Sequence, residues 1–199
     1  SEEINKYMKN NQRIKLITRL GRNGLSSAIK EGLIFAQGEY LLVLDGDGQH
    51  DPKFVLNMIN EIRNSKSDLV IGSRFLSSSN LVGLSNKRSL GSKIANKVAR
   101  FSLPNRYSFI TDYLSGCFCI NKASTKILIR KIEINGFKFL YEFLSLSKGK
   151  LSISEVPLIF KEREYGDSKL DLAIVWDFFI SILHNFTLRL IPRRAISFG

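Results

Sequence analysis

The chain has 199 residues, 44% of them hydrophobic, and carries a formal net charge of +12. This hydrophobic fraction supports a packed core and excludes global disorder, while the length favours one domain. The positive charge indicates an anionic partner, which composition leaves open among nucleic acid, a lipid surface and a phosphorylated substrate.

Helical and extended patterns alternate along the chain. We expect helices at 2–12, 24–36, 52–64, 86–103, 137–148 and 170–191. We expect extended segments at 13–18, 40–44, 68–72, 113–121 and 151–160, with a Ser- and Asn-rich loop at 76–86. Such alternation is typical of an α/β domain with a mainly parallel central sheet flanked by helices on both faces. Cys117 and Cys119 fall in one extended segment and are expected to be reduced and buried.

The strongest chemical signal is the segment YLLVLDGDGQHD at 40–51. Its apolar strand delivers Asp45 and Asp47 at the carboxyl end, where open α/β sheets bind ligands. Asp47 and Gln49 can offer oxygens to one hard cation such as Mg²⁺ or Mn²⁺, and Gly46 lets the backbone turn tightly. A solvated turn is the alternative, since Asp and Gly are common in turns, but the buried strand before the motif favours a site.

A second set of candidate residues is basic. Arg74 follows a predicted strand, Arg88 stands near the start of a predicted helix, and Arg163 and Lys169 flank a Gly- and Ser-containing loop. Arginine suits bidentate phosphate binding, and lysine serves as a point charge. Each residue alone is more simply a solvated surface charge, but the 163–169 loop could close over a diphosphate.

Six motifs follow one another along the chain. They are RNGLSSAIKEG (22–32), LDGDGQHDP (44–52), DLVIGSRF (68–75), NKRSLGSKIAN (86–96), TDYLSGCF (111–118) and EVPLIFKEREYGDSKL (155–170). Together they resemble the dolichol-phosphate mannose synthase group of family 2 glycosyltransferases. The resemblance implies the GT-A fold, a single α/β domain that binds a nucleotide-diphospho-sugar.

The resemblance also implies roles for individual residues on the donor side. Asp45 and Gly46 would contact the nucleotide-sugar, and Asp47 and Gln49 would hold Mg²⁺ or Mn²⁺ on its diphosphate. Phosphate groups of the donor or the lipid would be held by Arg74, Arg163 and Lys169. Of these residues, Asp47, Arg74 and Arg163 are the expected catalytic ones.

On the acceptor side, the resemblance implies that Arg88 lies near a lipid phosphate, with Asp112 and Ser115 lining the same region. The implied reaction is metal-dependent and inverting, and it moves a hexose from a GDP- or UDP-linked donor to polyprenyl or dolichyl phosphate. A phosphate monoester is largely ionised at neutral pH because its second pKa is about 6, so the reaction needs no general base.

The resemblance suggests two parts in the chain. Residues 1–169 are expected to form the GT-A domain, without an N-terminal strand that carries nucleotide-binding motifs in the family. Residues 170–199 are expected to form an amphipathic interfacial helix and the start of a membrane-proximal segment. The expected location is the cytoplasmic face of a membrane, and the expected partners are a nucleotide-sugar, a polyprenyl phosphate and the membrane surface, without nucleic acid.

Three alternatives compete with this interpretation. A haloacid-dehalogenase-like phosphatase also places D-x-D after an apolar strand, but it needs Thr or Ser soon after the second Asp, where Gly48 and Gln49 stand. A sugar nucleotidyltransferase would need a glycine-rich phosphate loop near its N-terminus. A basic nucleic-acid-binding module would need exposed aromatic residues interleaved with cations, whereas most of the phenylalanines fall at predicted core or interfacial positions.

Overall fold

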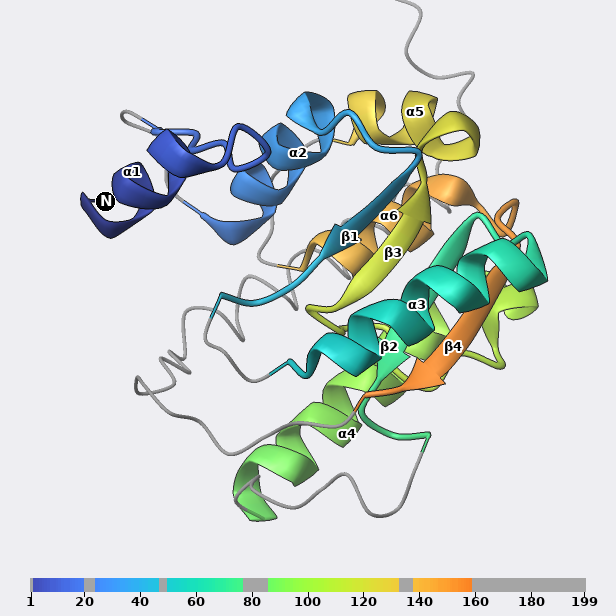
Figure 1. Ribbon diagram of the computed structural model, residues 1–199. Helices are drawn as coiled ribbons and strands as arrows, with labels where there is room; N and C mark the ends of the chain where they lie inside the picture. Colours follow the sequence, from blue (N-terminus) through green and yellow to red (C-terminus); the bar gives the residue numbers. More distant parts are fainter. Residues whose placement is uncertain (1, 20–23, 47–49, 77–85, 133–137, 159–199) are drawn as a thin grey trace, which may run out of the picture.

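The computed structural model describes residues 2–19, 24–46, 50–76, 86–132 and 138–158. Its helices are α1 (Glu2–Asn10), α2 (Leu25–Phe35), α3 (Pro52–Ser65), α4 (Asn86–Ser102), α5 (Lys122–Lys131) and α6 (Phe139–Ser147). Its strands are β1 (Tyr40–Val43), β2 (Leu69–Ser73), β3 (Phe118–Asn121) and β4 (Ile153–Pro157). Figure 1 shows the strands packed together with helices around them.

The described sheet has four strands in the order β1-β3-β2-β4. β2 pairs with β4 in parallel, whereas β3 is antiparallel to both β1 and β2. Three strands therefore point in one direction, as expected, and the reversed β3 between them makes the sheet mixed. Val43 of β1 and Ile71 of β2 both pair with Phe118, the first residue of β3. The ends of β1 and β2 and the start of β3 consequently meet at one edge, called here the carboxyl edge.

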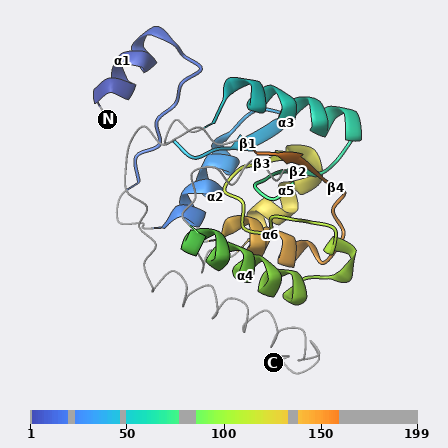
Figure 2. The same ribbon diagram turned by 90° about the horizontal axis from the view of Figure 1, so that it is seen from below.

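Helices cover both faces of this sheet, and Figure 2 shows α3 on one side of the strands with α2, α4 and α6 on the other. Successive side chains of β2 point to opposite faces of the sheet. Leu69 and Ile71 therefore belong to the larger core cluster, and Val70 belongs to the smaller cluster beneath α3. Phe118 and Ile120 of β3 join the larger cluster as well. The layers match the flanked sheet that the sequence pattern predicts.

Local signals explain where two helices begin. Asp51 caps α3, because its carboxylate accepts a hydrogen bond from the backbone N–H of Lys53 at 2.8 Å, and Pro52 occupies the first turn. Asn121 ends β3 and caps α5 in the same way, accepting from the N–H of Ala123 at 2.9 Å. Asn121 thus marks both the end of β3 and the beginning of α5, a helix that the sequence analysis did not predict.

Two expected strands differ from the structure. Segment 13–18 forms no strand: Leu16 and Ile17 are 38% and 39% exposed, and no strand pairs with them among the described residues. The strand expected at 113–121 is shortened to β3, because residues before it turn and bond through side chains instead of a ladder. The predicted boundary at residue 169, the helix at 170–191 and most of the 76–86 loop lie outside the described residues. Within the described part, no helix is long and apolar enough to cross a membrane.

Gly72→Ala tests the close packing of α3 on β2. A Cβ at position 72 would lie 2.8 Å from Phe54 Cζ and 3.3 Å from the carbonyl oxygen of Cys117, closer than ordinary contact. We expect the free energy of unfolding, measured by urea denaturation, to fall by about 1–3 kcal/mol. Gly91→Ala in α4 is the control: its Cβ meets nothing within 4 Å, and we expect a gain of up to about 1 kcal/mol. Equal effects of the two changes would contradict this packing.

Glu142 of α6 makes stability depend on pH. Its Oε2 is buried without a hydrogen-bond partner among the described residues, and burial raises the pKa of its carboxyl to about 7. Because the folded state binds this proton more tightly than the unfolded state, the stabilisation is complete below about pH 4.5 and is lost as pH rises to about 7.

Glu142→Gln should therefore match the wild type in stability near pH 4.5 and exceed it at pH 8 by about 1–3 kcal/mol. Thermal unfolding at both pH values measures the difference. The matched control is Glu61→Gln in α3, which makes the same carboxyl-to-amide change away from α6. A Glu142→Gln variant whose stability follows the wild type at every pH would show that the carboxyl is not desolvated.

Candidate active site at the carboxyl edge of the sheet

The carboxyl edge gathers predicted site residues from three separate segments. Asp45 follows β1 by two positions, and Arg74 follows β2 directly. The segment 111–117 leads into the reversed β3, which brings Asp112 and Ser115 to the same edge. Residues nearly seventy positions apart in the sequence are therefore neighbours because β3 lies between β1 and β2.

Asp45 lies against the backbone of Gly116. A Cβ built on Gly116 would stand 3.1 Å from Asp45 Oδ2 and 3.5 Å from Oδ1, so only glycine leaves the carboxylate undisturbed. Asp45 itself is exposed, which leaves its oxygens accessible to a ligand. The Asp45 carboxylate, predicted at the end of β1, thus lies next to the 111–117 segment and is exposed to solvent.

Arg74 and Asp112 form a bidentate ion pair. Arg74 donates from Nε to Asp112 Oδ2 at 2.7 Å and from Nη2 to Oδ1 at 2.8 Å, and its backbone N–H donates to Oδ2 at 3.2 Å. Asp112 is fully buried, and its Oδ1 also accepts from Asn96 Nδ2 of α4 at 3.4 Å. Burial alone would lower the pKa of Arg74, but the hydrogen bond and charge of Asp112 and the charge of Asp45 raise it above its usual value.

This pairing leaves part of the Arg74 guanidinium available. Within the described part of the chain, Nη1 makes no hydrogen bond, while the guanidinium carbon lies 5.5 Å from the centre of the Phe75 ring. A guanidinium held on one side by a carboxylate presents its remaining N–H groups in a fixed direction, which suits binding of a phosphate.

Lys138 belongs to the same charged region, although the sequence analysis did not single it out. It directly precedes α6, and burial, followed by the charge of Arg74, lowers its pKa, while Asp112 and Asp45 act in the opposite direction. A lysine just before the apolar run FLYEFL was the only available signal, and that pattern is common on protein surfaces. Lys138 adds a second cation to the region of Arg74.

Ser115 and the cysteines have structural contacts here. Ser115 is buried, donates from Oγ to the carbonyl of Gly72 at 2.6 Å and accepts from the N–H of Cys117 at 3.1 Å. Cys117 and Cys119 are free and buried, as expected, and burial raises the pKa of Cys119 to about 11 and that of Cys117 further. Asp112 and Ser115 are both buried. Their direct contact with an acceptor stays a prediction.

Other predicted site residues fall outside the described residues, namely Asp47, Gln49, Arg163 and Lys169. Arg88 lies in α4, and its side chain is likewise outside the described part. Among the described residues, no three acidic, histidine or cysteine side chains are grouped to hold a metal ion. His50, just beyond the acidic motif, stacks on Phe54 with ring centres 6.1 Å apart.

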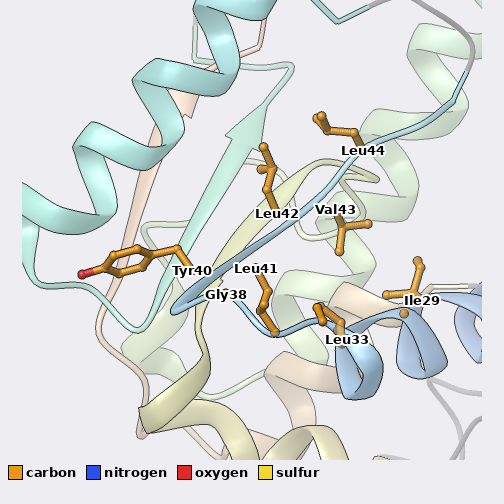
Figure 3. A pocket seen from close by; sticks show the side chains of 10 residues that line it. Ile29, Leu33, Gly38, Tyr40, Leu41, Leu42, Val43 and Leu44 are labelled. Carbon is orange, nitrogen blue, oxygen red and sulfur yellow. The ribbon is translucent and has the colours of Figure 1, made fainter. Parts of the chain in front are cut away.

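A groove runs along β1, away from these charges. Its walls come from α2 and β1 and include Ile29, Leu33, Leu42 and Leu44, as Figure 3 shows. β1 pairs with β3 on one side only, so the groove follows the free edge of the described sheet. Its apolar lining offers no charged group for a diphosphate, which leaves the carboxyl edge as the chemically suited site.

Comparison with known proteins agrees with the motifs. The sequence model of glycosyl transferase family 2 matches residues 1–125. The chain belongs to glycosyl transferase family 2. The family's matched region contains Asp45, Arg74, Asp112 and Ser115, and so covers the whole described carboxyl edge except β4 and Lys138.

Three curated relatives that the chain matches carry the same name. The chain is 37% identical over 168 residues to the dolichol-phosphate mannosyltransferase of Pyrococcus furiosus, covering 83% of this chain and 46% of that protein. It is 29% identical to that of Mycosarcoma maydis, covering 94% and 63%, and 27% identical to that of Saccharomyces cerevisiae, covering 87% and 65%. The resemblance stated from the motifs is confirmed, and the chain spans about half to two thirds of these relatives.

Solved structures confirm the GT-A fold. Glucosyl-3-phosphoglycerate synthase from Mycobacterium tuberculosis, in complex with Mn²⁺, UDP-glucose and phosphoglyceric acid, superposes with a TM-score of 0.60 at 17% identity, covering 89% of this chain and 59% of that one. The complex of the same enzyme with Mg²⁺ and UDP gives a TM-score of 0.55, also at 17% identity, covering 89% and 58%. Identities this low establish the fold alone.

Gly116→Ala tests whether the position of the Asp45 carboxylate next to Gly116 matters for ligand binding. The added methyl group would push the carboxylate by a few tenths of an ångström, and we expect affinity for a GDP- or UDP-sugar, measured by calorimetry with Mn²⁺ on the full-length protein, to fall about tenfold. Gly32→Ala in α2 is the control, because a Cβ there meets nothing within 4 Å and the residue lies outside the predicted site, so affinity should change less than twofold. Unchanged affinity in Gly116→Ala would mean that Asp45 does not contact the donor.

Proposed function

We propose that this chain is the catalytic part of a membrane-associated glycosyltransferase that moves a hexose from a GDP- or UDP-linked donor to polyprenyl or dolichyl phosphate. The observation that carries the proposal is the meeting of the exposed Asp45 with the Arg74–Asp112 pair at the carboxyl edge. The curated relatives, which are dolichol-phosphate mannosyltransferases by name, support the acceptor class. Membership in glycosyl transferase family 2 argues against the alternative interpretations as a phosphatase or a nucleotidyltransferase.

Donor binding is assigned to the tip of β1 and the loop after it. Asp45 would accept hydrogen bonds from the nucleotide, since its carboxylate is exposed and lies close to Gly116 at the carboxyl edge. Asp47 and Gln49 follow within four residues, and their carboxylate and amide oxygens are ligands that Mg²⁺ and Mn²⁺ accept together with phosphate oxygens. When bound, such an ion would neutralise charge on the leaving diphosphate.

The transfer step needs a positively charged surround and an anionic nucleophile. A phosphate oxygen of the lipid would attack the anomeric carbon, while the bond from that carbon to the donor diphosphate breaks and the nucleoside diphosphate leaves with the electron pair. In-line attack inverts the configuration of the sugar. Arg74 Nη1, Lys138, Arg163 and Lys169 would stabilise the phosphate charges, and the ionised acceptor makes a general base unnecessary.

The outward face of α4 supports a membrane partner. Ile94 and Phe101 are 54% and 70% exposed, and they share this face with the exposed cations Lys93, Lys97 and Arg100. Apolar groups flanked by cations suit the boundary between lipid headgroups and acyl chains. Together with the interfacial helix expected at 170–191, α4 would hold the site at the cytoplasmic face of a membrane, close to the lipid phosphate.

Asp47→Ala tests the metal assignment and the reaction together. The full-length protein is supplied with polyprenyl phosphate, Mn²⁺ or Mg²⁺, and GDP-mannose or UDP-glucose, and the release of nucleoside diphosphate is measured with and without the lipid. We expect release to depend on the lipid and the metal, to stop with a chelator, and to fall at least about 100-fold in Asp47→Ala.

The matched control is Asp51→Ser, four residues further on. Serine keeps the cap of α3, so the activity should stay within about threefold of the wild type. Release that is independent of lipid phosphate would refute the acceptor class. Release that persists in Asp47→Ala would refute the metal site while leaving the transfer itself standing.

A further inference from the structure

Glu155, in the middle of β4, contacts the segment that carries Asp112. Its two carboxylate oxygens each accept from the backbone N–H of Thr111 at 3.0 Å and from Thr111 Oγ1 at 3.1 Å, and Oε1 also accepts from the backbone N–H of Asp112 at 3.3 Å. All of these groups donate to the carboxylate. An ionised carboxylate accepts on both oxygens, as in this arrangement, whereas an amide in its place could accept on one atom only.

The residues held by Glu155 adjoin the Arg74 ion pair. The Thr111 and Ser73 hydroxyl oxygens lie 2.5 Å apart, and the carbonyl of Ser73 accepts from the N–H of Leu158 at 2.8 Å. Asp112 then holds Arg74 through Nε, Nη2 and the backbone N–H. Hydrogen bonds thus run without interruption from β4 through Thr111 and Asp112 to the guanidinium at the end of β2.

A carboxylate at position 155 is electrostatically unfavourable, because it is partly buried and lies near the negative charge of Asp112. Burial raises the pKa of Glu155, hydrogen bonds from Thr111 and Asp112 lower it, and the nearby negative charge of Asp112 raises it again. Among the described residues, hydrogen bonds connect the carboxylates of Glu155 and Asp112 with the guanidinium of Arg74. A neutral β-strand residue would pair β4 with β2 equally well, so the carboxylate is explained by what it orients.

We propose that Glu155 is a positioning residue that fixes the Thr111–Asp112 backbone, so that the Asp112 carboxylate holds Arg74 with Nη1 directed to an anionic ligand. The inference rests on the proposed function, in which that ligand is a phosphate of the donor or the acceptor lipid. The chain after β4 leads in the sequence to Arg163 and Lys169, which lie outside the described residues.

The decisive experiment is a double-mutant cycle in the full-length protein. Glu155→Gln places an amide NH₂ against N–H donors, and we expect kcat/KM for transfer to polyprenyl phosphate to fall about tenfold. In an Arg74→Ala background, the same change should lower kcat/KM further by less than twofold, because the group that it positions is gone. An equal tenfold loss in both backgrounds would overturn the proposal.

A readout independent of activity separates this proposal from the proposed function. The Arg74 Nε–H, bonded to Asp112, should give an NMR signal whose hydrogen exchange is slow in the wild type. We expect exchange to quicken about tenfold in Glu155→Gln and more in Asp112→Asn, whereas Ser154→Ala, the neighbouring strand residue, leaves it unchanged. Unchanged exchange in Glu155→Gln would refute the positioning role, whatever reaction the protein catalyses.

Thr111→Val provides a milder variant if Glu155→Gln folds poorly. It removes the hydroxyl contacts with Glu155 and Ser73 but keeps the two backbone N–H donors. We expect intermediate effects on both readouts, about threefold, with little change in the unfolding midpoint. A large loss of stability with unchanged Arg74 exchange would assign Glu155 and Thr111 to folding alone and contradict the proposal.

Discussion

The described site depends on one buried charge. The Asp112 carboxylate is fully buried, and an unpaired carboxylate at such a position would cost several kcal/mol. Arg74, Asn96 and the backbone N–H of Leu114 supply its hydrogen bonds. Because these donors come from the residue after β2, from α4 and from the 111–117 segment, the hydrogen bonds of this one carboxylate connect three parts of the fold. The guanidinium that the site needs is also the group that makes the buried carboxylate tolerable.

The reversed β3 is the topological feature that makes this possible. An antiparallel strand between β1 and β2 enters the sheet at the edge where its neighbours end. The segment before β3 therefore crosses the tips of β1 and β2, and the absence of a side chain at Gly116 lets Asp45 lie against it. In an all-parallel sheet, a connection before the middle strand would run at the opposite edge, and Asp112 would lie far from Arg74.

The carboxyl edge and the groove along β1 differ in chemical character. The carboxyl edge holds the carboxylates and cations, and the groove along β1 is lined by aliphatic residues. The exposed apolar residues of α4 stand beside cations. The proposed transfer from a water-soluble donor to a lipid would use such a division, with the phosphates reacting in a polar environment while the lipid chain stays in the bilayer.

Much of this protein followed from local pattern. The apolar run at 40–44, the cap and proline at 51–52 and the strand near 68–72 each carry their own signal, and the ordered motifs identified the family and the fold. The placement of Asp45 at a strand end was equally local, because it needs only the strand and the turn after it. What the sequence left open depends on partners distant in the chain.

Segment 13–18 has the composition of a strand, but a strand forms only where another supplies its hydrogen bonds. Lys138 and Glu155 look like ordinary surface charges in the sequence and gain meaning only beside Arg74 and Asp112. The resemblance places Asp112 on the acceptor side, and the fold adds that its carboxylate is buried and paired with Arg74. Periodicity indicates which face of an element is apolar, but tertiary packing decides the direction of β3 and the neighbours of each charge. A buried carboxylate either meets donors there, as Asp112 does, or holds its proton more tightly, as Glu142 does.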